Sequence, residues 1–260
     1  MNEYSSSSEL KALSKGQLFG NYGTVNGIYL IHILCTLPLS FMISPISNVS
    51  LELYYPLLLL VNLFAGFFVA GEALVYLKVA CHERPAVSDL FYYFRGPYTE
   101  RGTKVIRIQL VLSAVSVFCS MPSSYVSLAL TKDMINRLNT NPDPVSMELP
   151  INSVLFLVYA IPLVIGCFIQ ILVQLLLSQA FYLMLDFPEY SGPELLRLAP
   201  KLIKGHKARL FYIILSFFPL NLLCVFSCGI GYLWVYPYMQ TTYANFYLDL
   251  VQKRKPSGLH

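Results

Sequence analysis

The sequence predicts an all-α protein, a polytopic bundle of six transmembrane helices in one domain covering residues 1–260. Hydrophobic residues make up 56% of the chain and charged residues only 12%, whereas charged residues are roughly a quarter of a soluble domain. The apolar residues form six runs, each long enough to cross a bilayer, for which roughly 20 residues are needed. Lys and Arg gather in alternate gaps between these runs, which is typical of a chain that crosses lipid repeatedly.

Each predicted span follows from one apolar run. The spans cover about residues 22–44, 54–79, 105–130, 151–185, 210–226 and 232–250. Because the fourth run is longer than a bilayer requires, we expect it to tilt, to kink at Pro162 or to project into the cytosol. The break between the last two runs, at residues 228–231, is short and apolar. This break leaves two alternatives, since the last two spans either cross fully or dip into the membrane and return.

The basic residues predict the orientation. Sixteen of the 18 Lys and Arg residues lie in the N-terminal segment, in the gaps after spans two and four, and in the tail. Only Lys132 and Arg137 lie on the other side. The excess of positive charge on cytoplasmic loops therefore places both termini in the cytoplasm and residues 139–150 outside. The N-terminus does not resemble a cleavable signal, because about twenty polar or amphipathic residues precede an apolar run that is too long.

Two amphipathic segments that precede spans share a pattern. Ser6 with Glu9 and Ser191 with Glu194 have the spacing of a capping box, and a glycine follows each segment at the same distance. A weaker third segment begins at Ser88. We interpret these as three units, each a short cytosolic interfacial helix followed by a transmembrane hairpin, with a symmetry axis along the membrane normal. The alternative interpretation is that amphipathic helices preceding spans look alike for physical reasons alone.

The segment before the fifth span predicts a contact with lipid headgroups. Arg197, Lys201 and Lys204 fall on one side of a helix, and Lys207 follows at the membrane edge. Basic residues in this position attract anionic headgroups. The functional interpretation is lipid sensing or the docking of a partner on the cytosolic side, and the simpler interpretation is ordinary anchoring beside a span. Since the basic residues border spans, they face headgroups first, and we expect no nucleic-acid partner.

Two ionisable residues are predicted at membrane depth, where burial of a charge is costly. His32 lies near the middle of the first span, and Glu72 lies about two turns inside the second. Because the two spans run antiparallel, their depths differ by about one helical turn, which allows a contact that relays a proton. The alternative is a neutral His32 hydrogen-bonded within the bundle and a Glu72 that reaches the basic cytosolic edge.

Polar side chains recur at helical spacing along three spans. Such seams either pack helices closely through small residues and hydrogen bonds or line a hydrated path for a headgroup or solute. At the cytosolic edge, the spacing also predicts a ring of ion pairs that fixes helix ends. The seam residues are Ser113, Ser116 and Ser120, then Gln170, Gln174 and Ser178, then Thr242 and Asn245, and the ring residues are Asp186, Asp249, His206, Lys207 and Arg209.

No motif indicates catalysis. The sequence has no His-Glu-x-x-His, no Gly-x-Ser-x-Gly, no phosphate-binding glycine loop and no Cys-x-x-Cys pair. The six cysteines are scattered, mostly in apolar runs. We therefore predict no catalytic residue, metal or cofactor.

Three stretches give the chain a resemblance to a known family. They are residues 18–23 (Leu-Phe-Gly-Asn-Tyr-Gly), residues 204–211 from Lys-Gly-His-Lys to Arg-Leu-Phe, and residues 229–234 (Gly-Ile-Gly-Tyr-Leu-Trp) with the motifs that follow as far as Tyr247. The chain resembles the domain-of-unknown-function 975 family of bacterial integral membrane proteins along essentially its whole length. This resemblance implies a bacterial plasma membrane and a distant similarity to the membrane domain of some glycerophosphodiester phosphodiesterases. It implies no activity and no site residues.

Together these observations predict a multi-pass membrane protein that is not an enzyme and that organises lipid or docks a partner through its basic cytosolic helices. The alternative is a transporter or lipid-moving protein that uses the polar seams. A third hypothesis is an intramembrane enzyme built on His32 and Glu72.

Overall fold

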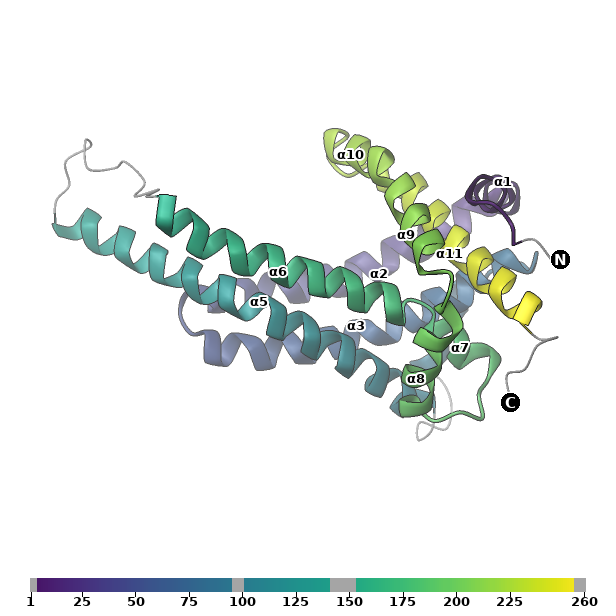
Figure 1. Cartoon of the computed structure of the whole chain (residues 1–260), viewed down its shortest axis with the longest axis horizontal. Coiled ribbons are helices and arrows are strands. Elements are labelled where there is room, and N and C mark those ends of the chain that lie inside the picture. Colours follow the sequence, from purple (N-terminus) through teal and green to yellow (C-terminus); the bar gives the residue numbers. More distant parts are fainter. Residues whose placement is uncertain (1–3, 95–100, 141–152, 255–260) are drawn as a thin grey trace. The chain divides into compact units, whose positions relative to one another are not determined.

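All regular secondary structure of the described residues is helical, which confirms the all-α class. The computed structural model describes residues 4–94, 101–140 and 153–254, apart from the side chains of 133–134, 137–140, 153–159 and 254. Its longer helices are shown in Figure 1. The elements are α1 (Ser7–Leu18), α2 (Tyr22–Ile43), the 3-10 helix η1 (Ser44–Asn48), α3 (Leu51–Ala80), α4 (Val87–Leu90), the 3-10 helix η2 (Tyr92–Phe94), α5 (Arg101–Thr140), α6 (Ser153–Leu177), α7 (Ala180–Asp186), α8 (Gly192–Ile203), α9 (Lys207–Ser216), α10 (Phe218–Phe226) and α11 (Tyr232–Arg254).

Five helical segments of the described residues are long and apolar enough to cross a membrane, which indicates a membrane protein. They are Tyr22–Asn48, Leu51–Ala80, Arg101–Lys132, Ala160–Asp186 and Lys207–Phe226. The helix at the position of the predicted sixth span, α11, is not among them. It has 23 residues, but polar residues such as Gln240, Asn245 and Asp249 recur along it. The sixth span therefore stays a prediction.

Helix ends differ from the predicted spans at three places. The helix of the third span, α5, continues to Thr140, ten residues beyond the predicted end, because the polar residues that follow Leu130 include neither Gly nor Pro. The predicted outer loop therefore lies partly on a helix, and residues 141–150 of it lie outside the described residues. The fourth run stays helical through Pro162 and divides instead between Leu177 and Ala180. The fifth divides at Phe217, where Pro219 enters the first turn of α10 and cannot donate a backbone hydrogen bond.

The described helices fall into two compact units. The first contains Met1–Leu37, Leu63–Gln109 and Leu175–His260, and the second contains Pro38–Asn62 and Leu110–Gln174. The helices α2, α3, α5 and α6 each contribute residues to both units, so the division falls within helices and not in a linker. That the whole chain forms one membrane domain stays a prediction.

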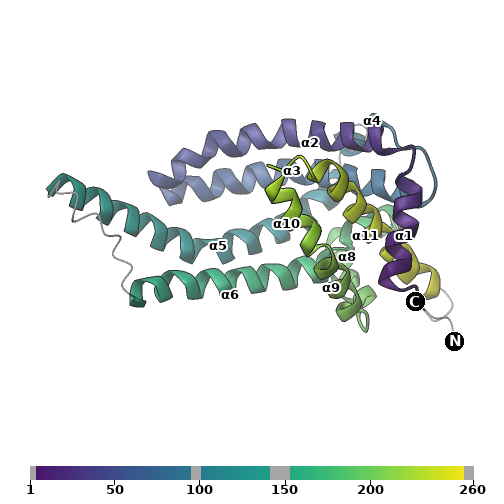
Figure 2. The same cartoon turned by 90° about the horizontal axis from the view of Figure 1, so that it is seen from above.

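In the second unit, α5 and α6 run side by side (Figure 2). Their backbones approach closely at Gly166, because a Cβ atom there would lie 2.5 Å from the carbonyl oxygen of Cys119. A small residue is required at such a contact between transmembrane helices. The helix hairpin is therefore held by direct backbone packing at this point.

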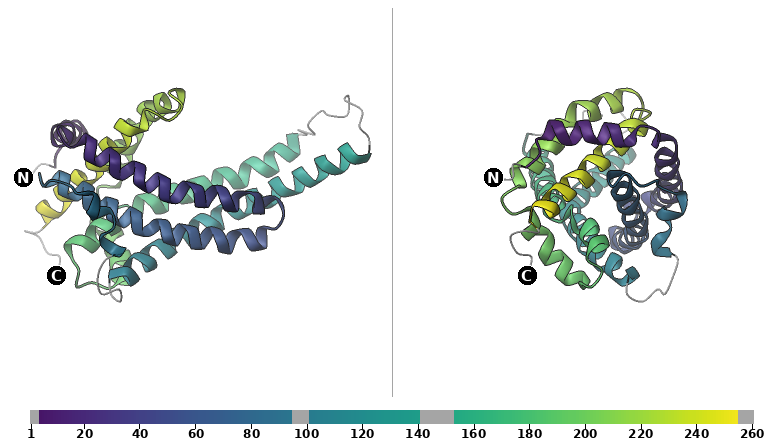
Figure 3. Two further views of the ribbon diagram at one scale, coloured as in Figure 1. Left: turned by 180° about the vertical axis from the view of Figure 1, so that it is seen from behind. Right: turned by 90° about the vertical axis from the view of Figure 1, so that its right-hand side faces the viewer.

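In the first unit, α11 is enclosed by other helices. It contacts α1, α8 and α10, and Figure 3 shows α1 in purple lying across α11 in yellow. Its residues Ala244, Phe246, Tyr247 and Leu250 are fully buried. Two glycines after Cys228 reverse the chain between α10 and α11, and Gly229 has a φ of +87° that glycine adopts without strain.

The helices α1 and α8 have the same local geometry. Each has 12 residues, and each begins where a Glu side chain accepts the backbone N–H of the residue three positions before it, at 2.7 Å in both cases. Each ends in an extended cap residue followed by a glycine, Gly20 with φ +85° and Gly205 with φ +90°. The same cap and turn therefore join each short helix to the helix that follows.

The middle segment shares the N-terminal cap but not the length of these two helices. There, α4 has only four residues, and the 3-10 helix η2 follows it. Asp89 bonds the N–H of Ala86 at 2.9 Å and the ammonium of Lys78 at 2.8 Å. Gly71 of α3 has Leu90 so close that a Cβ atom would collide with its carbonyl oxygen. The segment therefore packs closely on α3 as a short turn of helix, unlike the predicted interfacial helix.

The two glycine turns should be equally sensitive to substitution. Gly20→Ala and Gly205→Ala should each lower the free energy of unfolding by about 1 kcal/mol, because a Cβ atom is strained at positive φ. Gly16→Ala is the control, since Gly16 lies inside α1 with open space around it, and Ala there should stabilise the helix by about 0.5–1 kcal/mol. Unfolding in detergent micelles, followed by circular dichroism, measures all three. Neutral effects at both turn glycines would contradict the proposed geometry.

Candidate functional site

Three helices bring a carboxylate, an imidazole and a phenol together in the first unit. The carboxylate is Glu72 of α3, which is 3% exposed. One of its oxygens, Oε1, lies 2.8 Å from Nδ1 of His32 in α2. The other, Oε2, accepts a hydrogen bond of 2.7 Å from the hydroxyl of Tyr236 in α11. We call these three residues the carboxylate triad.

Aromatic rings surround the triad. The imidazole of His32 stacks on Phe68, with ring centroids 5.6 Å apart. The ring of Tyr236 stacks on Tyr29 at 4.2 Å and lies perpendicular to Tyr76 at 6.2 Å. The phenol oxygen of Tyr76 is buried and has no hydrogen-bond partner in the part of the chain that the structure describes. Such an environment excludes water from the carboxylate and strengthens its interaction with the imidazole.

The triad lies well inside two candidate spans. Glu72 is eight residues from the end of α3, and His32 is ten residues from the start of α2. At about 1.5 Å per residue these offsets are about 12 and 15 Å along the helix axes. Among the described residues, His32 is the only basic side chain within ion-pairing distance of Glu72. An unpaired buried charge would cost several kcal/mol, and the contact with His32 reduces that cost.

The sequence indicated two members of the triad and missed the third. The predicted His32–Glu72 contact requires only that the first two spans be antiparallel neighbours. Tyr236 is not among the site residues that the sequence predicts. No spacing rule connects it with Glu72, which is 164 residues away along the chain. Only the path of α11 past α3 places its hydroxyl on the carboxylate.

The predicted polar face of α11 is used for packing. The side chain of Asn245 donates hydrogen bonds to Ser14 at 2.8 Å and to Gln17 at 2.6 Å, both in α1. Gln17 in turn donates to the carbonyl oxygen of Ala80 at 2.7 Å. The hydroxyl of Thr242 bonds the carbonyl oxygen of Tyr238 within its own helix. This face of α11 therefore fastens α1 and the end of α3.

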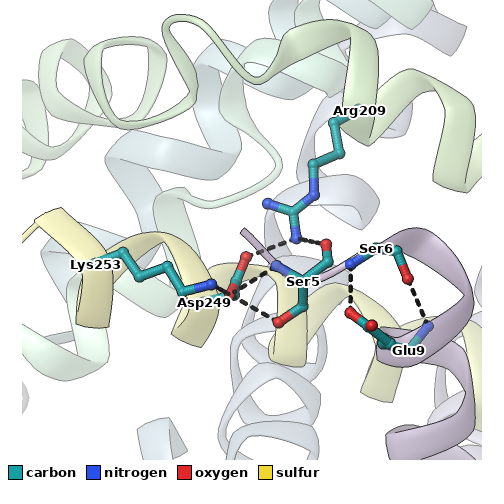
Figure 4. Close-up of polar contacts among 6 residues, drawn as sticks. All are labelled: Ser5, Ser6, Glu9, Arg209, Asp249 and Lys253. Carbon is teal, nitrogen blue, oxygen red and sulfur yellow. Dashed lines mark hydrogen bonds and ion pairs between the residues drawn. The ribbon is translucent and has the colours of Figure 1, made fainter. Parts of the chain in front are cut away.

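One part of the predicted ion-pair ring is present. Asp249 binds Arg209 at 2.6 Å and Lys253 at 3.0 Å, and it also accepts hydrogen bonds from Ser5 (Figure 4). Asp186 does not join this cluster. It accepts a hydrogen bond of 2.7 Å from the hydroxyl of Tyr247 instead. The cluster therefore fastens the N-terminal segment and the start of α9 to the end of α11.

The basic residues of α8 are exposed on one face. Arg197, Lys201, Lys204 and the first residue of α9, Lys207, are all exposed. On the opposite face, Leu195, Ala199, Leu202 and Ile203 are buried within the first unit, at 0 to 1% exposure. The apolar face of α8 is therefore covered by protein and is not open to lipid. This differs from the predicted helix lying in the membrane interface, whose apolar face would enter the bilayer.

Capping holds α8 in this position. Glu194 accepts hydrogen bonds from the backbone N–H and the hydroxyl of Ser191, at 2.7 and 2.8 Å. These bonds, together with the nearby Arg197 and Lys104, lower the pKa of Glu194. A carboxylate that stays charged in the first turn of a helix also interacts favourably with the helix dipole.

The predicted seams of α5 and α6 do not form one continuous polar surface. The hydroxyls of Ser120 and Ser178 bond carbonyl oxygens of their own helices, at 3.0 Å each. Ser113 is buried and Ser116 half-buried. Gln174 is exposed, whereas Gln170 is half-buried and its side-chain oxygen has no partner among the described residues. The seams therefore include one polar group, Gln170, whose hydrogen bonding is incomplete.

Comparison with known proteins gives a family and no activity. No curated protein and no solved structure matches the chain. The family model described as a protein of unknown function, DUF975, matches residues 1–254. This match covers nearly the whole chain and confirms the resemblance seen in its glycine and aromatic motifs. The chain belongs to the DUF975 family.

Proposed function

We propose that this is a multi-pass protein of the bacterial plasma membrane that binds anionic lipid headgroups at the cytosolic surface through one basic face. The face consists of Arg197, Lys201, Lys204 and Lys207. The observation that carries the proposal is that all four are exposed while the opposite side of α8 is buried in protein. The protein has no catalytic role in this proposal.

The position of the basic face beside a span favours lipid as the ligand. Lys207 is the first residue of the candidate span Lys207–Phe226, and Lys204 precedes it by one turn. Charges at the end of a span lie near the headgroups, where each Lys or Arg contributes about 1 kcal/mol with anionic lipid. Since the apolar face of α8 is already buried, binding is electrostatic and the helix need not insert.

The burial of α8 also distinguishes this face from simple anchoring. A side chain that only anchors a span can be supplied by a flexible loop. Here Arg197 and Lys201 stand on α8, and Lys204 is its C-terminal cap residue. This helix is fixed by Leu195, Leu202 and Ile203, each buried at 0 or 1% exposure. The backbone positions of these charged residues are therefore set by packing, as a site for several headgroups requires.

Replacing two charges of this face should weaken the binding of anionic lipid. Lys201→Gln with Lys204→Gln should lower the affinity for phosphatidylglycerol by about 2 kcal/mol, roughly 30-fold. Native mass spectrometry of the purified protein with phosphatidylglycerol or phosphatidylcholine measures the lipids retained. Arg84→Gln with Lys132→Gln is the charge-matched control, since both residues are exposed and lie outside α8. Equal loss in the two double variants would refute a specific site.

The proposed orientation has both termini in the cytoplasm and α11 crossing the membrane as a sixth span. Two observations support the crossing. The segment Lys207–Phe226 has 20 residues, which is long enough to traverse the hydrocarbon core. The chain then reverses at residues 227–231, and α11 has 23 residues in which to return.

Two exposed cysteines test this topology. Cys228 lies at the α10–α11 turn and Cys81 at the end of α3. In single-cysteine variants of intact cells, a membrane-impermeant maleimide should label Cys228 from outside. It should label Cys81 only after the membrane is permeabilised. Labelling of Cys228 from the inside alone would mean that α10 and α11 dip into the membrane and return.

We also infer that α1 and α8 are equivalent members of a repeat whose axis lies along the membrane normal. Their equal length, common cap and common glycine turn support this inference. The middle segment supports it less, since α4 has only four residues. Similar losses of stability in Gly20→Ala and Gly205→Ala are the expected outcome, and a loss at one position alone would count against equivalence.

A second candidate function, the movement of lipid between leaflets, is favoured by Gln170. A buried amide oxygen without a partner costs roughly 1–3 kcal/mol, and contact with a passing headgroup would satisfy it. Gln170→Leu should then lower the rate at which proteoliposomes expose a fluorescent phospholipid to an external quencher. Gln174→Leu is the control, because Gln174 is exposed. Equal rates in protein-containing and protein-free vesicles would exclude this function.

A further inference from the structure

We propose that the carboxylate triad of His32, Glu72 and Tyr236 is a proton-binding site inside the membrane-spanning part of the protein. This inference is independent of headgroup binding by α8, because the two sets of residues do not overlap. The proposed ligand is a single exchangeable proton, held between Nδ1 of His32 and Oε1 of Glu72, which are 2.8 Å apart.

The residue types of the site favour exchange of a proton over a permanent ion pair. Structural ion pairs elsewhere in the first unit use Arg or Lys, as Asp249 does with Arg209 and Lys253. Those partners keep their charge at physiological pH. Imidazole is the side chain whose charge changes between about pH 5 and pH 8. The net charge of a buried carboxylate paired with His32 therefore depends on pH.

The protons can be counted in each state. With one proton, the pair is either imidazolium with carboxylate or imidazole with carboxylic acid, and both forms are neutral overall. Addition of a second proton leaves an imidazolium beside a carboxylic acid. Loss of the shared proton leaves an imidazole beside a carboxylate. The hydroxyl of Tyr236 donates to Oε2 in each state, so it holds the carboxyl group in place while the charge changes.

The two members of the pair are unequally buried. The side chain of His32 is 15% exposed and that of Glu72 is 4% exposed. The imidazole is therefore the member less enclosed by protein. Phe68 stacks on His32, and Tyr29 stacks on Tyr236.

The other titratable groups near Glu72 are phenols. They come from each helix packed around it and interact with it electrostatically: Tyr29 of α2, Tyr76 of α3, Tyr182 of α7 and Tyr236 of α11. None of these phenols carries a charge near neutral pH. The unpaired hydroxyl of Tyr76, one helical turn from Glu72, adds a polar group that a water molecule or the protonated carboxyl can bind.

Infrared spectroscopy of the full chain in lipid nanodiscs tests the proposal. The wild-type protein should show a carboxylic-acid C=O band that changes in intensity between about pH 5 and pH 8 and shifts in D2O. Glu72→Gln should remove this band, because the amide keeps the shape of the side chain but cannot bind the proton. Tyr236→Phe should keep the band but move its frequency, since one hydrogen bond to the carboxyl is lost.

Two further variants separate proton binding from a structural role. His82→Gln removes an exposed imidazole and should leave the band unchanged. His32→Gln should fix Glu72 in its protonated form and make the band independent of pH, a result available even where Glu72→Gln does not fold. A band that titrates in the same way with and without His32, or a folded Glu72→Gln protein with the wild-type band, would overturn the proposal.

Discussion

The first unit depends on one helix that carries polar groups into an apolar environment. Lipid offers no hydrogen bonds, so polar side chains at membrane depth must find partners within the chain. Along α11, Tyr236 binds Glu72 of α3, Asn245 binds Ser14 of α1, and Tyr247 binds Asp186 of α7. At its end, Asp249 binds Arg209 of α9. Four neighbouring helices are thus fastened to α11 by polar contacts within the chain.

This arrangement explains how α1 and α8 serve different purposes with the same local geometry. The buried face of α1 includes Ser14 and Gln17, which bond α11 and the end of α3. The buried face of α8 consists of Leu195, Ala199, Leu202 and Ile203, and it packs without polar contacts of this kind. Of the exposed basic residues, α8 carries Arg197 and Lys201, Lys204 caps it, and Lys207 begins α9. The two helices have the same cap and turn, which determine where each helix lies. The side chains of the buried face determine what each helix binds.

The sequence predicted the features of the structure that depend on residues close together in the chain. The starts of α2 and α3 and the caps at Ser6 and Ser191 follow from hydropathy and capping, and the structure agrees with them. Helix ends were less predictable, since α5 continues through polar residues to Thr140. The break after Leu177 has no proline or glycine to mark it. Partners across long separations were not predictable, because whether Asp186 binds Arg209 or Tyr247 depends on how the helices cross.

The polarity of α11 follows from its burial. Hydropathy identifies helices that face lipid, because lipid selects apolar side chains on an exposed surface. A helix enclosed by other helices is under no such selection, and α11 has Thr241, Thr242 and Asn245 buried at 0 to 3% exposure. Its low hydropathy is therefore consistent with a position inside the bundle. The polar residues that lower the hydropathy of α11 are the same residues that bind Glu72, α1 and α9. A helix enclosed in this way does not need an apolar surface, because the chain itself provides its surroundings.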